Sequence, residues 1–213
     1  MKDIAIYGGG GFSKEIACLI NCINEKEPVW NFIGFFNRDK KIGEENEYGK
    51  VLGDIPELNA WESELNIVIA IGNPESVFKV ASEIKNDNIV FPNLFSPDTV
   101  FLDKNNISFG KGNIICVGCS FSCNVKIGDF NIFNGRINIG HDVSIGNFNA
   151  LMPSVKISGN VSIGNRNFFG VSSVVLQKMK IGNQVRLGAS SVLMTKVKDG
   201  NSYVGNPATI FKF

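Results

Sequence analysis

The second half of the chain carries an apolar residue at every sixth position. The series holds for fifteen successive positions: Phe109, Ile115, Phe121, Ile127, Phe133, Ile139, Ile145, Leu151, Ile157, Ile163, Phe169, Val175, Ile181, Leu187 and Leu193. Every eighteen residues the apolar residue starts an Ile-Gly-Asn or Ile-Gly-Asp motif. Three segments of six, each a short strand and a corner, close one triangular coil. The repeat therefore predicts a parallel β-helix.

Strand alternation places a second inward column two residues before the apolar one. On one face this column is Asn113, Asn131, Asn149 and Asn167, and on another it is Val125, Val143 and Val161. Stacked amides satisfy one another, so we expect a structural ladder of asparagines. The outward residues Ile114, Ile132, Ala150 and Phe168 should form an exposed apolar stripe. Such a stripe favours an interface between copies of the chain or packing against the N-terminal part.

The first hundred residues show alternating strand and helix patterns instead. Strands are predicted at residues 4–7, 32–36, 67–71 and 89–91, and helices after the first strand and at about 75–85. This alternation is typical of a small parallel sheet in an α/β domain. We therefore expect a Rossmann-like α/β domain over residues 1–96 and the β-helix over residues 97–213.

A run of four glycines, from Gly8 to Gly11, follows the first strand. Glycines there let backbone N–H groups and a helix N-terminus approach a phosphate. Ser13 takes the third place of the G-x-G-x-x-G motif, and Asn37 and Arg38 stand where a ribose-binding carboxylate is expected. A mononucleotide or nucleotide-sugar site is favoured over a dinucleotide site, with a turn without ligand as the alternative. The candidate substrate-binding residues are Gly8, Gly10, Gly11, Phe12, Asn37, Arg38, Gly72 and Asn73.

Composition narrows the function classes. With a net charge of +1 and 44% apolar residues, the chain is neither a disordered tail nor a basic nucleic-acid binder. No apolar run approaches the roughly 18 residues of a membrane span, and five cysteines in a chain of this size fit free thiols. We expect a soluble, cytoplasmic protein. A single histidine excludes a three-histidine zinc site, and Cys116, Cys119 and Cys123 alternate between corner and interior, so no metal is expected.

Three short motifs, added to the domain order and the repeat, resemble a known family. They are Ile139-Gly140-His141-Asp142, Ile157-Ser158-Gly159-Asn160 and Val204-Gly205-Asn206-Pro207-Ala208. Over its whole length the chain resembles the sialic-acid O-acetyltransferase and bacillosamine-pathway N-acetyltransferase family of left-handed β-helix acetyltransferases. The resemblance implies a left-handed coil and a homotrimer that binds acetyl-CoA in clefts between adjacent β-helices. It also implies a histidine at a coil corner as the general base.

The residues of this sequence agree with the roles that the resemblance implies. His141 comes two places after the inward Ile139, hence at a corner, and a histidine's ordinary pKa suits proton removal near neutral pH. Asp142 either orients the imidazole or, as a strand neighbour, points away from it. Gly159, one coil further at the same corner, leaves its N–H open to a thioester carbonyl, and a left-handed corner would be a second reason for glycine.

Further site residues come from the resemblance alone. It implies that Asn134 belongs to the catalytic set, that Val171 and Ala189 line the pantetheine channel, and that residues 205–208 (Gly205, Asn206, Pro207 and Ala208) lie near the CoA nucleotide. Asn134 sits at the corner before that of His141, so a shared site would draw on two subunits. Thr209 replaces the basic residue usual after the Pro-Ala pair.

Three departures from the family pattern concern the acceptor. The second histidine is Ala150, the histidine of the glycine turn is Phe12, and the acidic pair is Asn37-Arg38. The expected function is transfer of acetyl from acetyl-CoA to the amino group of a nucleotide-activated 4-amino-deoxy sugar in surface-polysaccharide biosynthesis. The alternatives are O-acetylation of a sugar hydroxyl and a non-catalytic β-helix scaffold.

Overall fold

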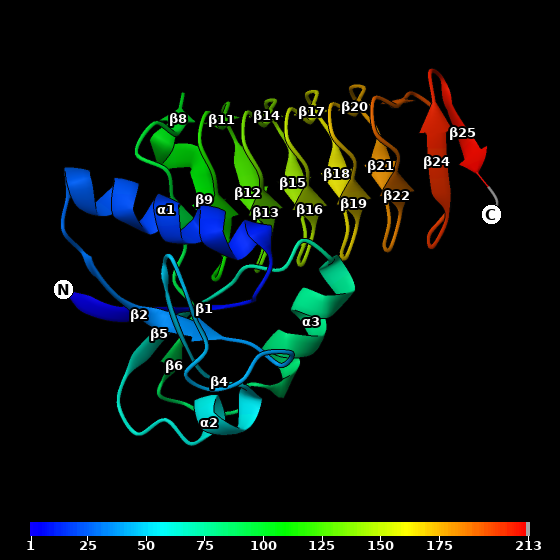
Figure 1. Cartoon of the computed structure of the whole chain (residues 1–213). Helices are drawn as coiled ribbons and strands as arrows, with labels where there is room; N and C mark the ends of the chain where they lie inside the picture. The colour runs from blue at the N-terminus through cyan, green and yellow to red at the C-terminus, as the bar shows by residue number, and fades with distance from the viewer. Residues whose placement is uncertain (212–213) are drawn as a thin grey trace. The chain divides into compact units, whose positions relative to one another are not determined.

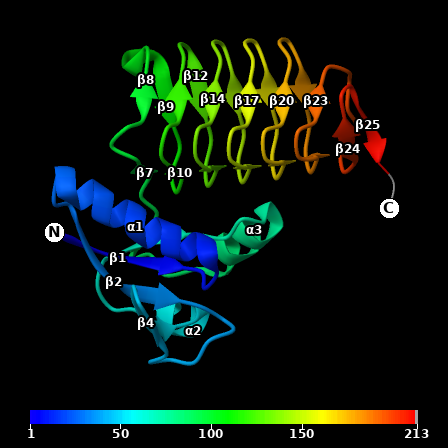
Figure 2. The same cartoon turned by 45° about the horizontal axis from the view of Figure 1, so that its top comes forward.

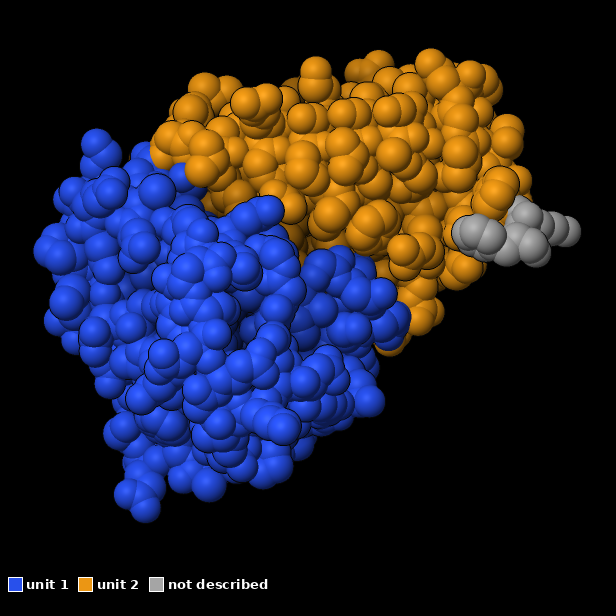
Figure 3. Space-filling model, in the orientation of Figure 1, with its two compact units in different colours: residues 1–97 blue, residues 98–213 orange. Residues whose placement is uncertain are grey.

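A computed structural model describes residues 1–211 of the chain. Its contacts divide the protein into two compact units, Met1–Pro97 and a second unit that begins at Asp98 (Figure 3). Within residues 1–211, no helix combines the length and apolar character needed to cross a membrane. The two units are described separately below, because each has its own core.

The first unit is an α/β domain with a six-stranded sheet (Figure 1). Its elements are β1 (Lys2–Tyr7), α1 (Gly11–Lys26), β2 (Trp30–Phe36), β3 (Glu45–Asn46), β4 (Gly49–Gly53), α2 (Ile55–Asn59), β5 (Leu65–Ile69), α3 (Pro74–Glu83), β6 (Ile89–Val90) and β7 (Leu94–Phe95). The sheet order is β3-β4-β2-β1-β5-β6, with only the β3–β4 pair antiparallel. The predicted parallel sheet is confirmed.

Three short elements between β2 and β5 were not predicted from the sequence. The β3–β4 hairpin is short and largely polar, so its hydrophobic pattern is weak. Helix α2 has five residues and starts with a capping box, in which Asp54 and Glu57 bond each other's backbone N–H groups. The Asp-x-x-Glu spacing and Pro56 in the first turn are the local signals that mark this helix start.

The order of the strands reverses between β1 and β5. From β1 the chain builds outward through β2 and β4, and it then returns to add β5 and β6 on the other side of β1. The connections after β1 and after β5 therefore lead away from each other. This arrangement opens a crevice at the carboxyl ends of the two strands, next to the start of α1.

The second unit is a left-handed parallel β-helix (Figure 2). Its three sheets are built in turn from short strands eighteen residues apart. The first sheet contains β10 (Ile114–Ile115), β13 (Ile132–Phe133), β16 (Ala150–Leu151), β19 (Phe168–Phe169), β22 (Arg186–Leu187), β24 (Ser202–Gly205) and β25 (Ala208–Phe211). The second contains β8 (Val100–Phe101), β11 (Ser120–Phe121), β14 (Asn138–Ile139), β17 (Lys156–Ile157), β20 (Val174–Val175) and β23 (Val192–Leu193). The third contains β9 (Ile107–Phe109), β12 (Val125–Ile127), β15 (Ser144–Ile145), β18 (Ser162–Ile163) and β21 (Lys180–Ile181), and a 3-10 turn at Lys104–Asn106 precedes it.

The interior of the β-helix matches the predicted columns. Every member of the six-residue apolar series is buried except Phe109, which is half-buried, and the column of valines is buried as well. In the asparagine ladder, each amide Nδ2 donates to the Oδ1 of the preceding coil, at 3.0, 2.9 and 2.9 Å for Asn131, Asn149 and Asn167. The structural ladder is thus confirmed.

The expected exposed apolar stripe is wrong for three of its four members. Ile114, Ile132 and Ala150 are only 0%, 2% and 1% exposed. Phe168 is half-buried, and the Arg186 guanidinium lies 4.7 Å from the centre of its ring. Strand alternation identifies the face on which a side chain lies, but it carries no information about what covers that face.

A second ladder explains the Ile-Gly-Asn motif. The Oδ1 atoms of Asn147 and Asn165 accept the backbone N–H of Asp129 and Asn147, one coil earlier, at 2.7 and 2.8 Å. A Cβ atom on Gly128, the glycine of that corner, would overlap Asn147 Oδ1 and lie 2.7 Å from Gly146 O. The glycine makes room for the asparagine of the next coil, and the pair recurs with the repeat.

Candidate active site

His141 lies at the corner between β14 and β15. Its side chain is 55% exposed, so the predicted corner position facing solvent is correct. The imidazole therefore has no role in the core and stays accessible to a small molecule. Two neighbours determine how the ring is presented.

Asp142 turns its carboxylate back onto the imidazole. Its backbone has φ +56°, the left-handed conformation that aspartate tolerates, and Oδ2 lies 2.7 Å from His141 Nδ1. Hydrogen bonds from His141 and then from Asn124 hold the pKa of the Asp142 carboxyl below its usual range. An ionised carboxylate only accepts, so the neutral ring carries its proton on Nδ1 and presents the Nε2 lone pair.

Gly159 lies one coil beyond His141 on the same edge of the β-helix. A Cβ atom at this position would overlap His141 Nε2, so only glycine leaves room for the ring. A left-handed backbone is not the reason for glycine here, because the residue with positive φ at this corner is Asn160, at +60°. Among residues 1–211, no acceptor bonds the Gly159 N–H. A free N–H donor therefore lies beside Nε2.

The other predicted residues of the β-helix lie elsewhere along it. Asn134, Val171 and Ala189 follow β13, β19 and β22, so they occupy the edge after the first sheet, whereas His141 and Gly159 occupy the edge after the second. Within one chain the structure does not bring Asn134 to the imidazole. Val171 is 47% exposed on its edge.

Residues 205–208 form the turn of the β24–β25 hairpin. Gly205 and Ala208 pair across the turn, and the Gly205 N–H donates to Ser191 Oγ at 3.0 Å. Gly205 has φ +108°, a backbone conformation that favours glycine. The turn is thus held to the last coil of the β-helix.

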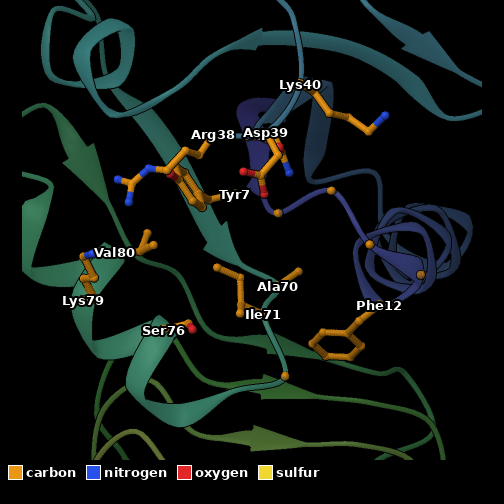
Figure 4. Close-up of a pocket in the computed structure, with 16 residues that line it drawn as sticks. Tyr7, Phe12, Arg38, Asp39, Lys40, Ala70, Ile71, Ser76, Lys79 and Val80 are labelled. Atoms are coloured by element: carbon orange, nitrogen blue, oxygen red, sulfur yellow. Dashed lines mark hydrogen bonds between the residues drawn. The ribbon is translucent and has the colours of Figure 1, made fainter.

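A cavity of about 780 Å³ lies in the first unit, in the crevice at the ends of β1 and β5 (Figure 4). All predicted substrate-binding residues line it except Asn73. The Asn73 side chain instead caps α3, accepting from the N–H groups of Glu75 and Ser76. The close-up shows Phe12 at the α1 side and Lys79 and Val80 on α3, with Ala70 and Ile71 between them.

The four glycines of the turn have two different roles. A Cβ atom on Gly8 would lie 2.7 Å from Ala70 O, and one on Gly9 would overlap Asn37 Nδ2. A Cβ atom on Gly10 or Gly11 would meet nothing within 4 Å. Gly8 and Gly9 therefore allow close packing, whereas Gly10 and Gly11 leave open space. Ser13 fills the third motif position and is buried.

Two of the three basic residues that line the cavity are held in ion pairs. Arg38 is paired with Asp54 at 3.4 Å and with Glu83 at 2.6 Å. Tyr7 donates to the same Asp54 at 2.5 Å, and burial and this bond raise the pKa of its phenol. Lys40 is paired with Glu44. Among the described residues that line the cavity, Lys79 is the cation without an ion pair.

Sequence reasoning missed Lys79 and Asn124. Lys79 follows Ser76 and precedes Val80 on the helix after the third predicted strand, and helical spacing brings all three to the cavity. Asn124 Nδ2 donates to Asp142 Oδ1 at 2.6 Å. The repeat could have identified Asn124, because Asn124 and Asp142 are eighteen residues apart.

Comparison with known proteins agrees with this architecture. Residues 3–84 match the family model described as the PglD N-terminal domain. No curated protein matches the chain. WeeI from Acinetobacter baumannii AYE shares 27% identity at TM-score 0.88, covering 99% of this chain and 100% of that one.

Two further solved structures contain ligands. The acetyltransferase domain of PglB from Neisseria gonorrhoeae FA1090, in complex with acetyl coenzyme A, shares 24% identity at TM-score 0.86 and covers 99% of each chain. PerB from Caulobacter crescentus, in complex with CoA and GDP-perosamine, shares 24% at TM-score 0.84, covering 100% of this chain and 98% of that one. The chain thus has the fold of the hexapeptide-repeat nucleotide-sugar N-acetyltransferases. Its first unit carries a PglD N-terminal domain.

Proposed function

We propose that this protein transfers the acetyl group of acetyl-CoA to the amino group of a nucleotide-linked 4-amino-deoxy sugar, a step in surface-polysaccharide biosynthesis. His141 acts as the general base. The observation that carries the proposal is the His141 corner, where Asp142 binds Nδ1 and leaves Nε2 free beside the Gly159 N–H.

The chemistry follows from that corner. His141 Nε2 takes the proton that the attacking amine loses as its nitrogen bonds to the acetyl carbon, and the CoA sulfur leaves with the electron pair of the broken bond. Asp142 stabilises the imidazolium that forms. The Gly159 N–H donates to the oxygen on which negative charge develops. Each contact serves the transition state of acyl transfer.

The second unit offers surfaces that fit acetyl-CoA. Val171 and Ala189 give one edge of the β-helix a small, apolar surface suited to a pantetheine arm. The Gly205–Ala208 turn lies at the end of the same unit and would contact the nucleotide. Support comes from the related folds, which were solved with acetyl coenzyme A or CoA bound.

The first unit would bind the acceptor. Its cavity meets the N-terminus of α1 at Gly10 and Gly11, where open space and a helix dipole suit a phosphate. Lys79 adds an unpaired positive charge, and Phe12 offers a flat apolar surface. PerB, of the same fold, was solved with GDP-perosamine. The residues that line the cavity fit a nucleoside diphosphate linked to a sugar.

We further propose that the active form is a homotrimer in the cytoplasm. The buried stripe removes one argument for the trimer, and the separate edges of Asn134 and His141 supply another. Two copies side by side would bring the Asn134 and Val171 edge of one to the His141 edge of the other. Five free cysteines within residues 1–211 fit a reducing compartment.

The test is an acetylation assay with acetyl-CoA and UDP-, dTDP- and GDP-linked 4-amino sugars. We expect one of them to be acetylated, and His141→Ala to lower kcat by roughly 10²–10⁴-fold with acetyl-CoA affinity unchanged. Turnover of the matching sugar that carries only hydroxyls would instead identify an O-acetyltransferase. Turnover undiminished in His141→Ala would refute the assigned base, and no turnover at all would favour a scaffold.

A further inference from the structure

Asn124 lies on the same edge of the β-helix as His141, one coil before it. It stands eighteen residues before Asp142, and the two residues share a left-handed backbone, with φ +54° and +56°. The repeat therefore stacks their side chains with equal orientation from successive coils. The Asp142 N–H also donates to Cys123 O at 3.0 Å, which keeps the two corners in register.

The Asp142 carboxylate is bound at both oxygens. Oδ1 accepts from Asn124 Nδ2 at 2.6 Å, and Oδ2 lies 2.7 Å from His141 Nδ1. A planar carboxylate with one oxygen fixed cannot rotate about its terminal torsion without losing that bond. The bond from Asn124 therefore sets the position of the oxygen that meets the imidazole.

We propose that Asn124 is a positioning residue that acts through Asp142 to keep the His141 proton on Nδ1 and the Nε2 lone pair available. This inference rests on the proposed function for its catalytic consequence, but its structural claim does not need a substrate. Asn124 touches no reacting atom in this arrangement.

The amide is suited to this position by its charge as well as its shape. A lysine or arginine would bind the carboxylate equally well, but it would offset the negative charge that stabilises the imidazolium. The asparagine amide donates a hydrogen bond and adds no charge. The positive φ of this corner is shared by Arg136, Lys178 and Gln184 at other corners, so the absence of charge rather than the backbone distinguishes asparagine here.

A matched control lies on the neighbouring strand. Asn138 Nδ2 donates to Ser120 Oγ at 2.7 Å, a bond between successive coils that is also exposed and also spans eighteen residues. That bond does not reach Asp142. Asn138→Ala therefore removes an amide of the same type from the same coils without touching the histidine.

The experiment compares the full-length protein with Asn124→Gly, Asn124→Asp and Asn138→Ala. Glycine keeps the left-handed corner, and aspartate keeps the shape while replacing the donor with a second carboxylate. The chain has one histidine, so the ¹⁵N signals of its two ring nitrogens belong to His141 and report which one carries the proton. The kinetic readout is kcat against KM for acetyl-CoA, with thermal unfolding checking that every variant folds.

In the wild type and in Asn138→Ala we expect the proton on Nδ1. In Asn124→Gly and Asn124→Asp that tautomer should lose population, and kcat should fall about tenfold, the scale of one hydrogen bond to a charged group, with KM for acetyl-CoA within twofold. Wild-type tautomer and kcat in a folded Asn124→Gly would overturn the proposal, and so would an equal loss in Asn138→Ala.

Failure of the proposed function gives a different pattern. If the wild type transfers no acetyl group but its tautomer still depends on Asn124, the positioning stands and the acetyltransferase assignment fails. If the wild type is active and the tautomer does not respond to Asn124, the assignment stands and the positioning role fails.

Discussion

Two stacks of polar side chains run through the β-helix with the same eighteen-residue spacing, yet they differ in what surrounds them. The inner ladder, from Asn113 to Asn167, is buried, and the amides of Asn131, Asn149 and Asn167 bond the coils on both sides. The outer stack of Asn124 and Asp142, with His141 beside it, is open to solvent. Both use asparagine amides that reach across one coil.

The difference between them is one of charge and burial. The inner ladder consists of neutral amides whose partners are all protein groups, because a charge there would lose its hydration. The outer stack contains a carboxylate and an imidazole, which water can stabilise while they change protonation state. An identical repeat thus places neutral, rigid amides inside and solvated titratable groups outside.

The largest effect we expect comes from breaking the inner ladder. In Asn149→Leu, the N–H of Asn167 loses its acceptor and the carbonyl of Gly164 loses its donor, while the apolar side chain keeps the volume. Two buried groups without partners should reduce the free energy of unfolding by about 3 kcal/mol. Urea denaturation monitored by circular dichroism measures this loss.

Asn138→Ala is the control for that measurement. Its amide also bonds between coils, but water replaces the lost partner, so we expect a change of no more than about 0.5 kcal/mol. Equal losses in the two variants would show that burial does not separate the two kinds of stack.

The next effect concerns the outer edge. In Gly159→Ala the new methyl group overlaps His141 Nε2, and the exposed ring can swing away without disturbing the coil. We expect kcat to fall at least about tenfold through loss of the bond to Asp142, with a thermal midpoint close to that of the wild type. Crystal structures or ring ¹⁵N signals would show the displacement, and wild-type kcat would contradict the assigned packing.

The periodic part of the molecule was predictable because each coil repeats the environment of the last. The apolar series, the asparagine ladder and the corner position of His141 all followed from a count of six and eighteen. The orientation of the Asp142 side chain did not follow, because the repeat fixes only the positive φ that recurs at every sixth residue from Asn124 to Ser190, and not the direction in which a corner side chain turns. The need for glycine at position 159 could be predicted only in part, because it arises from the His141 ring, which is close in space but not in sequence.

The first unit was less predictable because its cavity joins segments without a repeat. The candidate residues chosen from the glycine turn and the strand ends line the cavity, except for Asn73. The pairing of Arg38 with Asp54 and Glu83 was not foreseeable, because the partners lie sixteen and forty-five residues away on separate elements. Ion pairs between residues far apart in the sequence leave no periodic signal, so the charge of the cavity could be determined only from the structure.

A smaller effect is expected at Gly10. This glycine of the first unit borders open space, whereas the glycines at the coil corners are packed against neighbouring atoms. In Gly10→Val the new Cβ atom meets no protein atom within 4 Å, so the fold should keep its stability while the cavity loses room. We expect KM for the sugar nucleotide to rise about tenfold with KM for acetyl-CoA within twofold, the pattern of lost ground-state binding. An unchanged KM for the sugar would exclude the glycine turn from the acceptor site.

Gly8→Ala is the matched variant at the end of the glycine turn that is packed closely against other protein atoms. Its Cβ would lie 2.7 Å from Ala70 O, and its φ of +149° disfavours a side chain. We expect a loss of stability there that Gly10→Val does not show, measured by thermal unfolding. Similar thermal midpoints for Gly8→Ala and Gly10→Val would mean that the turn accommodates a side chain equally well at both positions.

The smallest effect is a dependence on pH that the outer stack can produce and the inner ladder cannot. The folded pKa of Asp142 lies below its unfolded value of about 3.9, so its contribution to stability is fully present above that value. As pH falls through the folded pKa, the carboxyl becomes protonated in the folded state too, and the contribution is lost. The difference in urea midpoint between the wild type and Asp142→Asn should therefore be present at about pH 5 and above and shrink below about 4. Amides do not titrate, so the destabilisation in Asn149→Leu should persist over the same range wherever the protein remains folded. A pH-independent difference for Asp142→Asn would mean that its carboxylate gains nothing from the bonds with Asn124 and His141.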